Sequence, residues 1–290
     1  MNKLSQGLLL ATLIATQPVF ACTKDGQEGF VPENKLNIPV NTKSITGISE
    51  NQFNSVIDQV EGIYAPLVSE YGGKLEVVRK WTDGTVNAYA QQEGDVWKVS
   101  MFGGLARHKT ITADGFALVV CHEIGHHIGG APRYAGGDWA SNEGQADYFA
   151  TLKCLRRVWQ SEDNASVVRQ MNVPEVLTTT CQKNWANEAD RAICIRGGMA
   201  GESVAKLFAA LAWSIKQPKF DTPDTRQVSS TSDGHPATQC RLDTYFQGAL
   251  CEKSFNEEIG QQDEVSGSCH GSTGHSTGLR PRCWFKPSVE

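Results

Sequence analysis

The sequence predicts an α+β fold that is mostly helical and contains a small antiparallel sheet. Three observations support this. Apolar residues recur at helical spacing through residues 50–71, three short β-rich runs follow between residues 74 and 102, and stretches at 113–128 and 142–159 predict further helices. The chain has 290 residues, of which 40% are apolar, so it can bury one sizeable core. Its formal charge of -5 argues against nucleic acid as a partner.

The first 21 residues have the pattern of a secretory signal peptide. Lys3 supplies the positive end, residues 8–15 form a short apolar stretch, and Ala21 is the small residue that signal peptidases prefer. The stretch is too short to span a bilayer, and no run of 18 apolar residues occurs elsewhere, so no transmembrane segment is predicted. The alternative is a buried N-terminal helix. We therefore expect an exported protein, either periplasmic or secreted.

Cys22 follows the expected cleavage point directly. In bacteria, a cysteine at this position can be acylated, which would anchor the mature chain to a membrane. The bulky Phe20 is unusual in such a lipidation signal, because a small residue usually stands there. Simple cleavage is therefore favoured, and lipidation of Cys22 remains the alternative.

Nine cysteines in an exported chain indicate disulfide bonds. Their odd number leaves at least one thiol free, lipidated or joined to another molecule. Nearest neighbours in the sequence give three expected pairs, which are Cys181–Cys194, Cys240–Cys251 and Cys269–Cys283. Cys121 is interpreted as a small core residue, with a cysteine switch or a metal-bound thiolate as the alternative.

The chain divides into an arm, one main domain and a tail. Residues 22–48 are polar and rich in Pro and Asn, which predicts an extended arm. The main domain covers residues 49–251. Residues 252–290 are rich in Gly and Ser and contain cysteines, and we expect this tail to be mobile except where the cysteines hold it.

Each element of the main domain has a local signal. The helix over 50–71 ends at Gly72-Gly73, and the helix over 113–128 ends at Gly129-Gly130. Ser141 or Asn142 can cap the helix over 142–159. The predicted strands cover 74–81, 86–91 and 96–102, with residues 92–95 joining the last two. Two more helices are predicted over 186–195 and 202–215, and the second, which is apolar on one face, is interpreted as part of the core.

The helix over 113–128 carries the pentapeptide His122-Glu123-Ile124-Gly125-His126, which has the pattern HExxH. Two histidines at positions i and i+4 lie on one helix face, so they can bind one metal ion. The glutamate between them can take a proton from a water on that ion. The motif therefore indicates a zinc metallopeptidase in which Glu123 is the general base. His127 points off this face and is expected to be a packing or rim residue.

A catalytic zinc site usually has three protein ligands, so a third must lie elsewhere. The position six residues after His126 is Pro132, which excludes a histidine there. Glu143 begins the following helix, and Asp147 lies on the same face at i+4. Glu143 is therefore the predicted third ligand, and Asp147 can accept a hydrogen bond from a ligand histidine. The alternative is an ordinary solvated acidic face.

A further motif, HPxxxxR, runs from His235 to Arg241. In order, HExxH, ExxAD (143–147) and HPxxxxR resemble the motifs of the HtpX and type I CAAX prenyl protease family, which are gluzincin zinc metallopeptidases. Residues 87–90, Asn-Ala-Tyr-Ala, are similar to the Asn-Ala-aromatic strand of that family, and Gly104-Leu105 is similar to its Gly-Leu before the metal helix. The resemblance covers about residues 85–241.

The resemblance implies a gluzincin-type metallopeptidase domain in which the edge strand of the sheet, Val96–Phe102, precedes the HExxH helix. A substrate peptide would lie along this strand. The implied metal is one zinc ion per chain, bound by His122, His126 and Glu143. The resemblance also implies further roles: His235 near the oxyanion, Arg241 and Asp147 supporting the ligands, and Asn87, Ala88 and Tyr89 binding substrate.

The membrane helices of the family are absent from this sequence, which suggests a soluble, exported member. The predicted function is zinc-dependent endopeptidase activity on exported or envelope proteins, with a polypeptide as substrate. One alternative is an exported chaperone, assembly factor or binding module that keeps a zinc site but rarely cleaves. Another is a structural module with an envelope protein as partner. The intact Glu123 favours the enzyme, because a binding protein needs no general base.

Overall fold

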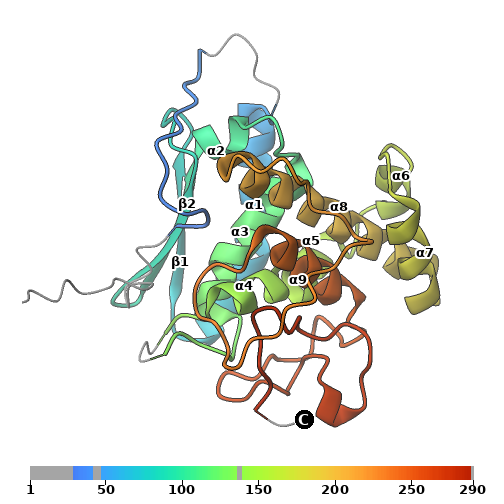
Figure 1. Ribbon diagram of the computed structural model, residues 1–290. Coiled ribbons are helices and arrows are strands. Elements are labelled where there is room, and N and C mark those ends of the chain that lie inside the picture. Colours follow the sequence, from blue (N-terminus) through green and yellow to red (C-terminus); the bar gives the residue numbers. More distant parts are fainter. Residues whose placement is uncertain (1–28, 42–46, 136–138, 289–290) are drawn as a thin grey trace, which may run out of the picture.

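The computed structural model describes residues 29–41, 47–135 and 139–288. The expected signal peptide and Cys22 lie outside these residues. A three-stranded sheet lies on one side of the molecule, and the helices pack against one face of this sheet (Figure 1). The first half contains α1 (Glu50–Glu70), β1 (Lys74–Lys80), β2 (Ala88–Glu93), β3 (Val96–Phe102), α2 (Gly103–Arg107) and α3 (Ala113–Ile128). No helix in the described part of the chain is long and apolar enough to cross a membrane.

The second half is almost entirely helical or irregular. It contains α4 (Glu143–Phe149), the π-helical turn η1 (Ala150–Cys154), α5 (Leu155–Trp159), α6 (Asn164–Val168), α7 (Glu175–Asn184), α8 (Glu188–Leu211), α9 (Thr238–Leu250) and the 3-10 turn η2 (Gly271–Thr273). The predicted α+β class is confirmed. The single helix predicted over 142–159 consists of α4, η1 and α5 in succession.

The sheet is mixed, whereas the sequence predicts an antiparallel one. Its strand order is β1-β3-β2, with β1 parallel and β2 antiparallel to β3. The prediction that Val96–Phe102 is the edge strand is therefore wrong, because β3 lies in the middle. A central strand is covered on both sides by its neighbours, and β3 ends in four consecutive buried residues. The strand edge that faces the arm belongs to β2.

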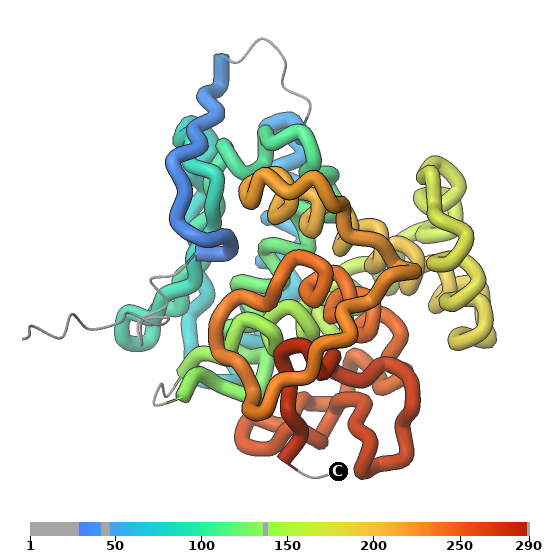
Figure 2. Tube along the Cα trace, viewed as in Figure 1, coloured from blue at the N-terminus to red at the C-terminus, as the bar shows by residue number. Residues whose placement is uncertain are grey.

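The arm runs alongside β2 and the residues before it (Figure 2). Ile38 donates a backbone hydrogen bond to Gly84, and Phe30 donates one to Ala88. The guanidinium of Arg107 donates to the carbonyl of Ile38 through two nitrogens, at 2.9 and 2.7 Å. The arm thereby continues the sheet beyond β2 at this end.

The HExxH helix α3 is the centre of the core. All of its residues after Ala113 are buried, and they pack against α1, α8 and the sheet. Thr112 caps its N-terminus, because its side chain accepts a hydrogen bond from the Gly115 amide at 3.0 Å. Such a helix gains its stability from tertiary packing and has almost no exposed face.

α8 is one helix where the sequence predicts two, over 186–195 and 202–215. The glycines between them favour a break, yet the structure uses them for close packing. A Cβ atom at Gly198 would lie 2.6 Å from Leu177, and one at Gly201 would lie 2.7 Å from Tyr245. Glycine here lets α7 and α9 approach the helix.

Four disulfide bonds connect eight of the nine cysteines, and they are Cys121–Cys154, Cys181–Cys194, Cys240–Cys283 and Cys251–Cys269. Only the predicted pair Cys181–Cys194 is confirmed. The predicted pair Cys240–Cys251 is wrong because helix α9 separates the two residues by about 16 Å, far beyond the reach of a disulfide. Cys121 is buried in the core as predicted, but as half of a disulfide rather than as a thiol.

The residues after Cys251 pack against the main domain. The sequence predicts a tail that only its cysteines hold, but Arg280 and Trp284 in this segment are buried. Arg280 donates to Gln145 of α4 at 2.6 Å, and the Trp284 ring leaves no space for a Cβ atom at Gly144. The prediction of a mobile tail is therefore wrong for Arg280 and Trp284, because both pack against α4, the helix that carries Glu143.

Candidate metal centre and cleft

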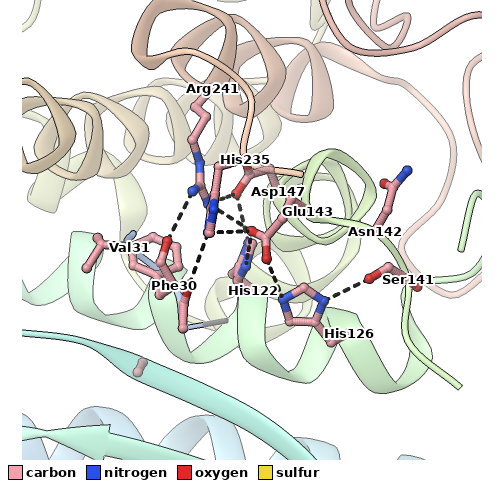
Figure 3. A network of polar contacts seen from close by, with 12 residues as sticks. Phe30, Val31, His122, His126, Ser141, Asn142, Glu143, Asp147, His235 and Arg241 are labelled. Carbon is pink, nitrogen blue, oxygen red and sulfur yellow. Dashed lines mark hydrogen bonds and ion pairs between the residues drawn. The ribbon is translucent and has the colours of Figure 1, made fainter. Parts of the chain in front are cut away.

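Three predicted metal ligands converge between α3 and α4. His122 Nε2 lies 3.4 Å from Glu143 Oε2, and His126 Nε2 lies 3.6 Å from Glu143 Oε1. One ligand atom from each residue fits within a group no wider than 4.8 Å, and all three residues are buried. The side chains point toward one another from the two helices (Figure 3). The predicted set is thus brought together by helices whose connection is only fourteen residues long.

Each histidine is oriented by a partner on its other nitrogen. His126 Nδ1 lies 2.8 Å from the carbonyl oxygen of Ser141, which can only accept, so Nδ1 carries the proton. His122 Nδ1 lies 2.8 Å from Asp147 Oδ1. The Ser141 contact leaves Nε2 of His126 as the acceptor nitrogen, and Nε2 of both histidines is directed toward Glu143, as in a metal site. Asp147 therefore contacts a ligand histidine, as predicted.

Asp147 is the centre of a buried charged network. Arg241 Nη2 donates to Asp147 Oδ1 at 2.6 Å, and the Tyr245 hydroxyl donates to the same oxygen at 2.7 Å. Burial favours the neutral acid, but the positive charge of Arg241 outweighs burial and lowers the pKa of Asp147. Arg241 is entirely buried and its guanidinium stacks 4.0 Å from the centre of the Phe208 ring. The network keeps a carboxylate ionised beside His122.

Glu123 lies between the two histidines on α3 and is 1% exposed. Burial raises the pKa of its carboxyl to about 8. By contrast, the pKa of Glu143 lies well below its usual range, because the charges of His235 and the neighbouring ligand histidines outweigh the effect of burial. The two glutamates thus differ in proton affinity within one site: the low pKa of Glu143 suits a metal ligand, and the raised pKa of Glu123 makes its carboxylate the stronger base.

His235 and Tyr134 approach Glu143 from two loops. His235 Nε2 lies 3.3 Å from Glu143 Oε2, and the Tyr134 hydroxyl donates to Glu143 Oε1 at 3.0 Å. The Tyr134 ring also stacks on His126, with ring centroids 6.3 Å apart. The structure therefore places His235 beside the ligand group, as the sequence predicts, and adds a tyrosine that the motifs do not include.

His127 is a packing residue, as expected. Its ring is stacked between Trp97, at 5.4 Å, and Trp139, at 5.0 Å, and it faces away from the ligand group. Its Nδ1 and Nε2 contact Gln92 and the carbonyl of Lys98. These contacts fasten α3 to the sheet next to the metal ligands.

Asn87, Ala88 and Tyr89 lie where β2 begins, opposite the arm. The Asn87 side chain is 3% exposed and donates to the hydroxyl of Tyr89 at 3.1 Å. A cavity of about 440 Å³ opens between this strand and the arm, with Tyr89, Glu33 and His235 among its walls. Of the three predicted substrate-binding residues, Asn87 and Tyr89 line this cavity together with His235, whereas Ala88 is buried and does not.

Sequence reasoning missed Tyr134, Ser141 as a carbonyl partner, Tyr245 and the arm residues in the cleft. Only Tyr245 carries a signal that could have revealed it, because it lies four residues after Arg241 and so on the same helix face. Tyr134 lies in an irregular loop, and the arm lies about 200 residues from His235 in the chain. Their positions depend on tertiary structure.

The residues present fit a zinc ion. Two imidazole nitrogens and one carboxylate form a common donor set for catalytic zinc. His122 Nε2 and Glu123 Oε1 are buried with no hydrogen-bond partner among the described residues, as expected for atoms that face an ion and its water. A second group, Asp224, Cys240 and Cys283, does not fit, because both cysteines belong to one disulfide.

Comparison with known proteins adds no assignment. No protein-family model matches the chain, and no curated protein or solved structure matches it either. The resemblance to the HtpX and prenyl protease family therefore rests on the sequence motifs alone.

Proposed function

We propose that this protein is a zinc-dependent endopeptidase that hydrolyses peptide bonds in exported or envelope proteins. The observation that carries the proposal is the convergence of His122, His126 and Glu143 around one point, with Glu123 on the same helix. The cleft beside this point is bordered by a strand edge, which can hold a peptide in extended form. One zinc ion per chain is implied.

The chain's own residues supply most of the proposed chemistry. A bound zinc ion would act as a Lewis acid toward water and the scissile carbonyl. Glu123 accepts the proton of the attacking water and delivers it to the leaving amine. His235 donates a hydrogen bond to the carbonyl oxygen as negative charge develops there. Asp147 and Arg241 keep His122 in the required orientation.

The proposal is tested by cleavage of casein with the zinc-loaded, disulfide-intact chain. The Glu123→Gln variant is expected to retain zinc and to lose at least about 100-fold in rate, because it loses its general base. Zinc content is measured by mass spectrometry of the metal. Glu76→Gln is a matched control, since Glu76 is exposed on β1. Undiminished cleavage by Glu123→Gln would refute the assignment.

The ligand roles are tested separately from turnover. His122→Ala and Glu143→Ala are each expected to lose stoichiometric zinc, because two remaining protein ligands bind the ion far more weakly. Full zinc occupancy in either variant would exclude that residue as a ligand. The same measurement on Glu123→Gln distinguishes loss of metal from loss of the base.

One observation favours the alternative function, a chaperone, assembly factor or binding module that keeps a zinc site. Phe30 of the arm is buried in the cleft, against His122. A protein that binds partners without cleaving them would retain this arrangement permanently. This alternative predicts that the wild-type chain and Glu123→Gln bind unfolded protein equally and cleave none.

The proposed location is outside the cytoplasm, in the periplasm or the extracellular space. The four disulfide bonds support it, because such bonds persist in oxidising compartments. Export by the predicted signal peptide is part of this proposal, and lipidation of Cys22 is the alternative to simple cleavage. Recovery of the mature chain in the membrane fraction, its release by detergent, and loss of this membrane association in Cys22→Ser would indicate the anchor.

A further inference from the structure

The arm residues Gly29, Phe30 and Val31 lie across the cleft and make the backbone contacts that a bound peptide would make. The Phe30 amide donates to the Ala88 carbonyl at 2.9 Å. Asn87 contacts both polar groups of Val31: its Oδ1 accepts from the amide at 3.0 Å, and its Nδ2 donates to the carbonyl at 3.1 Å. One backbone hydrogen bond and two hydrogen bonds from the Asn87 side chain thus hold the segment beside the start of β2, where a peptide could also bind.

The carbonyl groups of Gly29 and Phe30 contact residues beside the candidate metal ligands. The Gly29 carbonyl accepts a hydrogen bond from His235 Nε2 at 3.0 Å, and the same nitrogen lies 3.3 Å from the ligand Glu143. The Phe30 carbonyl accepts from Arg241 Nη1 at 3.1 Å. Figure 3 shows Arg241 and Phe30 in contact beside His122. The Gly29–Phe30 peptide bond therefore lies at the metal centre, with its carbonyl on His235.

The side chain of Phe30 fills an apolar pocket whose walls belong to the site. It is 1% exposed, and its ring meets the edge of His122 at 4.9 Å and the ring of Phe208 at 5.4 Å. The Arg241 guanidinium lies 4.8 Å from the same ring. A pocket of this kind selects a large apolar side chain immediately after the peptide bond.

The position before the bond has no space for a side chain. A Cβ atom at Gly29 would lie 2.4 Å from Asn87 Oδ1 and 2.5 Å from both Cγ and Nδ2 of the same side chain. Asn87 is fixed by its hydrogen bonds to Val31, so it cannot move away cheaply. In this bound geometry, the segment needs glycine before the bond and an aromatic residue after it.

We propose that the Gly29–Phe30 segment is bound as a substrate and that the site hydrolyses this bond in its own chain. The proposal rests on the proposed endopeptidase function. The oxygen of a water molecule bonds to the Gly29 carbonyl carbon while Glu123 takes one of its protons. The bond to the Phe30 nitrogen then breaks, and Glu123 delivers the proton to that nitrogen. The products are a carboxylate at Gly29 and a new amino-terminus at Phe30.

The same contacts define the class of external substrate. It is an extended peptide with glycine before the scissile bond and Phe or a similarly large apolar residue after it. Such a peptide has to replace the arm on Ala88 and Asn87, so cleavage or displacement of the arm precedes turnover of other chains. This order explains how a cleft already filled by its own chain can still act on other polypeptides.

The test begins with the full chain, purified without added metal and then loaded with Zn²⁺. Its new amino-terminus is determined by sequencing and intact mass, and casein cleavage is followed in the same samples. The wild-type chain is expected to be cut between Gly29 and Phe30, and Glu123→Gln is expected to stay intact. Gly29→Ala is expected to slow the cut at least tenfold, because the added Cβ displaces the segment, while casein cleavage does not fall.

A second measurement examines specificity in a synthetic peptide with the sequence of residues 26–35. Cleavage at Gly-Phe is expected, and a matched peptide with Phe30→Asp should be cut at least about tenfold more slowly, because a charge enters the apolar pocket. A wild-type chain that cleaves casein but leaves its own Gly29–Phe30 bond intact would overturn this inference alone. A chain that cleaves neither would overturn the proposed function. An equal cut in Glu123→Gln would assign the cut to another protease.

Discussion

The two walls of the cleft are held together in different ways. The helical wall consists of α3, α4 and α9 (Figure 1), with residues 252–288 packed against α4. Three disulfides close this part of the molecule. The sheet wall consists of the three strands and the arm, and the described residues 29–41 and 47–120 contain no cysteine. Backbone hydrogen bonds and apolar packing hold this second wall. The candidate metal ligands thus lie on the wall that disulfides close, whereas the contacts of Ala88 and Asn87 with the arm lie on the wall without them.

The largest effect is expected when the positive charge of Arg241 is removed from the centre of the helical wall. Arg241→Met leaves the buried carboxylates of Asp147 and Glu143 without their cation, so we expect a loss of about 3–5 kcal/mol in the free energy of unfolding. The measurement is urea unfolding of the metal-free protein in a Glu123→Gln background. The control is Tyr245→Phe, which removes one hydrogen bond to Asp147 and should cost about 1–2 kcal/mol. Equal costs would show that the charge pair does not stabilise this wall.

The next test opens the helical wall at its covalent link. Cys121→Ala with Cys154→Ala releases a crosslink spanning 33 residues, with an expected loss of about 3–4 kcal/mol. Because this bond joins α3 to the turn after α4, zinc affinity should fall as well, as measured by competition with a chelator.

The matched control is the double variant at Cys181 and Cys194, whose bond spans 13 residues in a separate hydrophobic cluster. Its stability loss should be about 3 kcal/mol, with zinc affinity unchanged. A similar fall in zinc affinity for both pairs would mean that the disulfides act on overall stability and not on ligand geometry.

The smallest effect is expected on the sheet wall. Asn87→Ala removes both hydrogen bonds to Val31 and should cost about 1–2 kcal/mol locally, which corresponds to a 5- to 30-fold faster exchange of the Val31 amide hydrogen. Hydrogen exchange with mass spectrometry measures this. Asn34→Ala is the control, because its contacts to Pro32 and Val86 are more exposed and should matter less. If Val31 exchanges at the wild-type rate in Asn87→Ala, the arm is held by Phe30 alone.

The two walls also differ in how much of their structure can be predicted from the sequence. On the helical wall, HExxH fixes two ligands because helical spacing is a local property, and the next helix supplies Glu143 and Asp147 by the same spacing. On the sheet wall, the sequence predicts where the three strands lie along the chain, but it does not predict their order in the sheet. Alternation within a strand gives no information about which strand lies in the middle.

Contacts between distant segments explain the remaining errors. The contact between His235 and Gly29 joins residues 206 positions apart, and no local pattern encodes it. The cysteine pairs depend on the length of α9, which the sequence reading did not recognise as a helix. The segment after Cys251 has a composition typical of a mobile tail, yet Arg280 and Trp284 give it buried contacts that composition does not reveal.

The burial of the ligand group has a kinetic consequence. His122 is entirely buried and Glu143 is 1% exposed, with Phe30 of the arm against the His122 ring. An ion in this position can leave, and a chelator can enter, only when the two walls separate. The rate of metal exchange is therefore set by opening of the arm rather than by the strength of the metal–ligand bonds. A tightly sealed cleft would retain its ion through brief exposure to chelators, and any peptide that displaces the arm would also make the ion exchangeable.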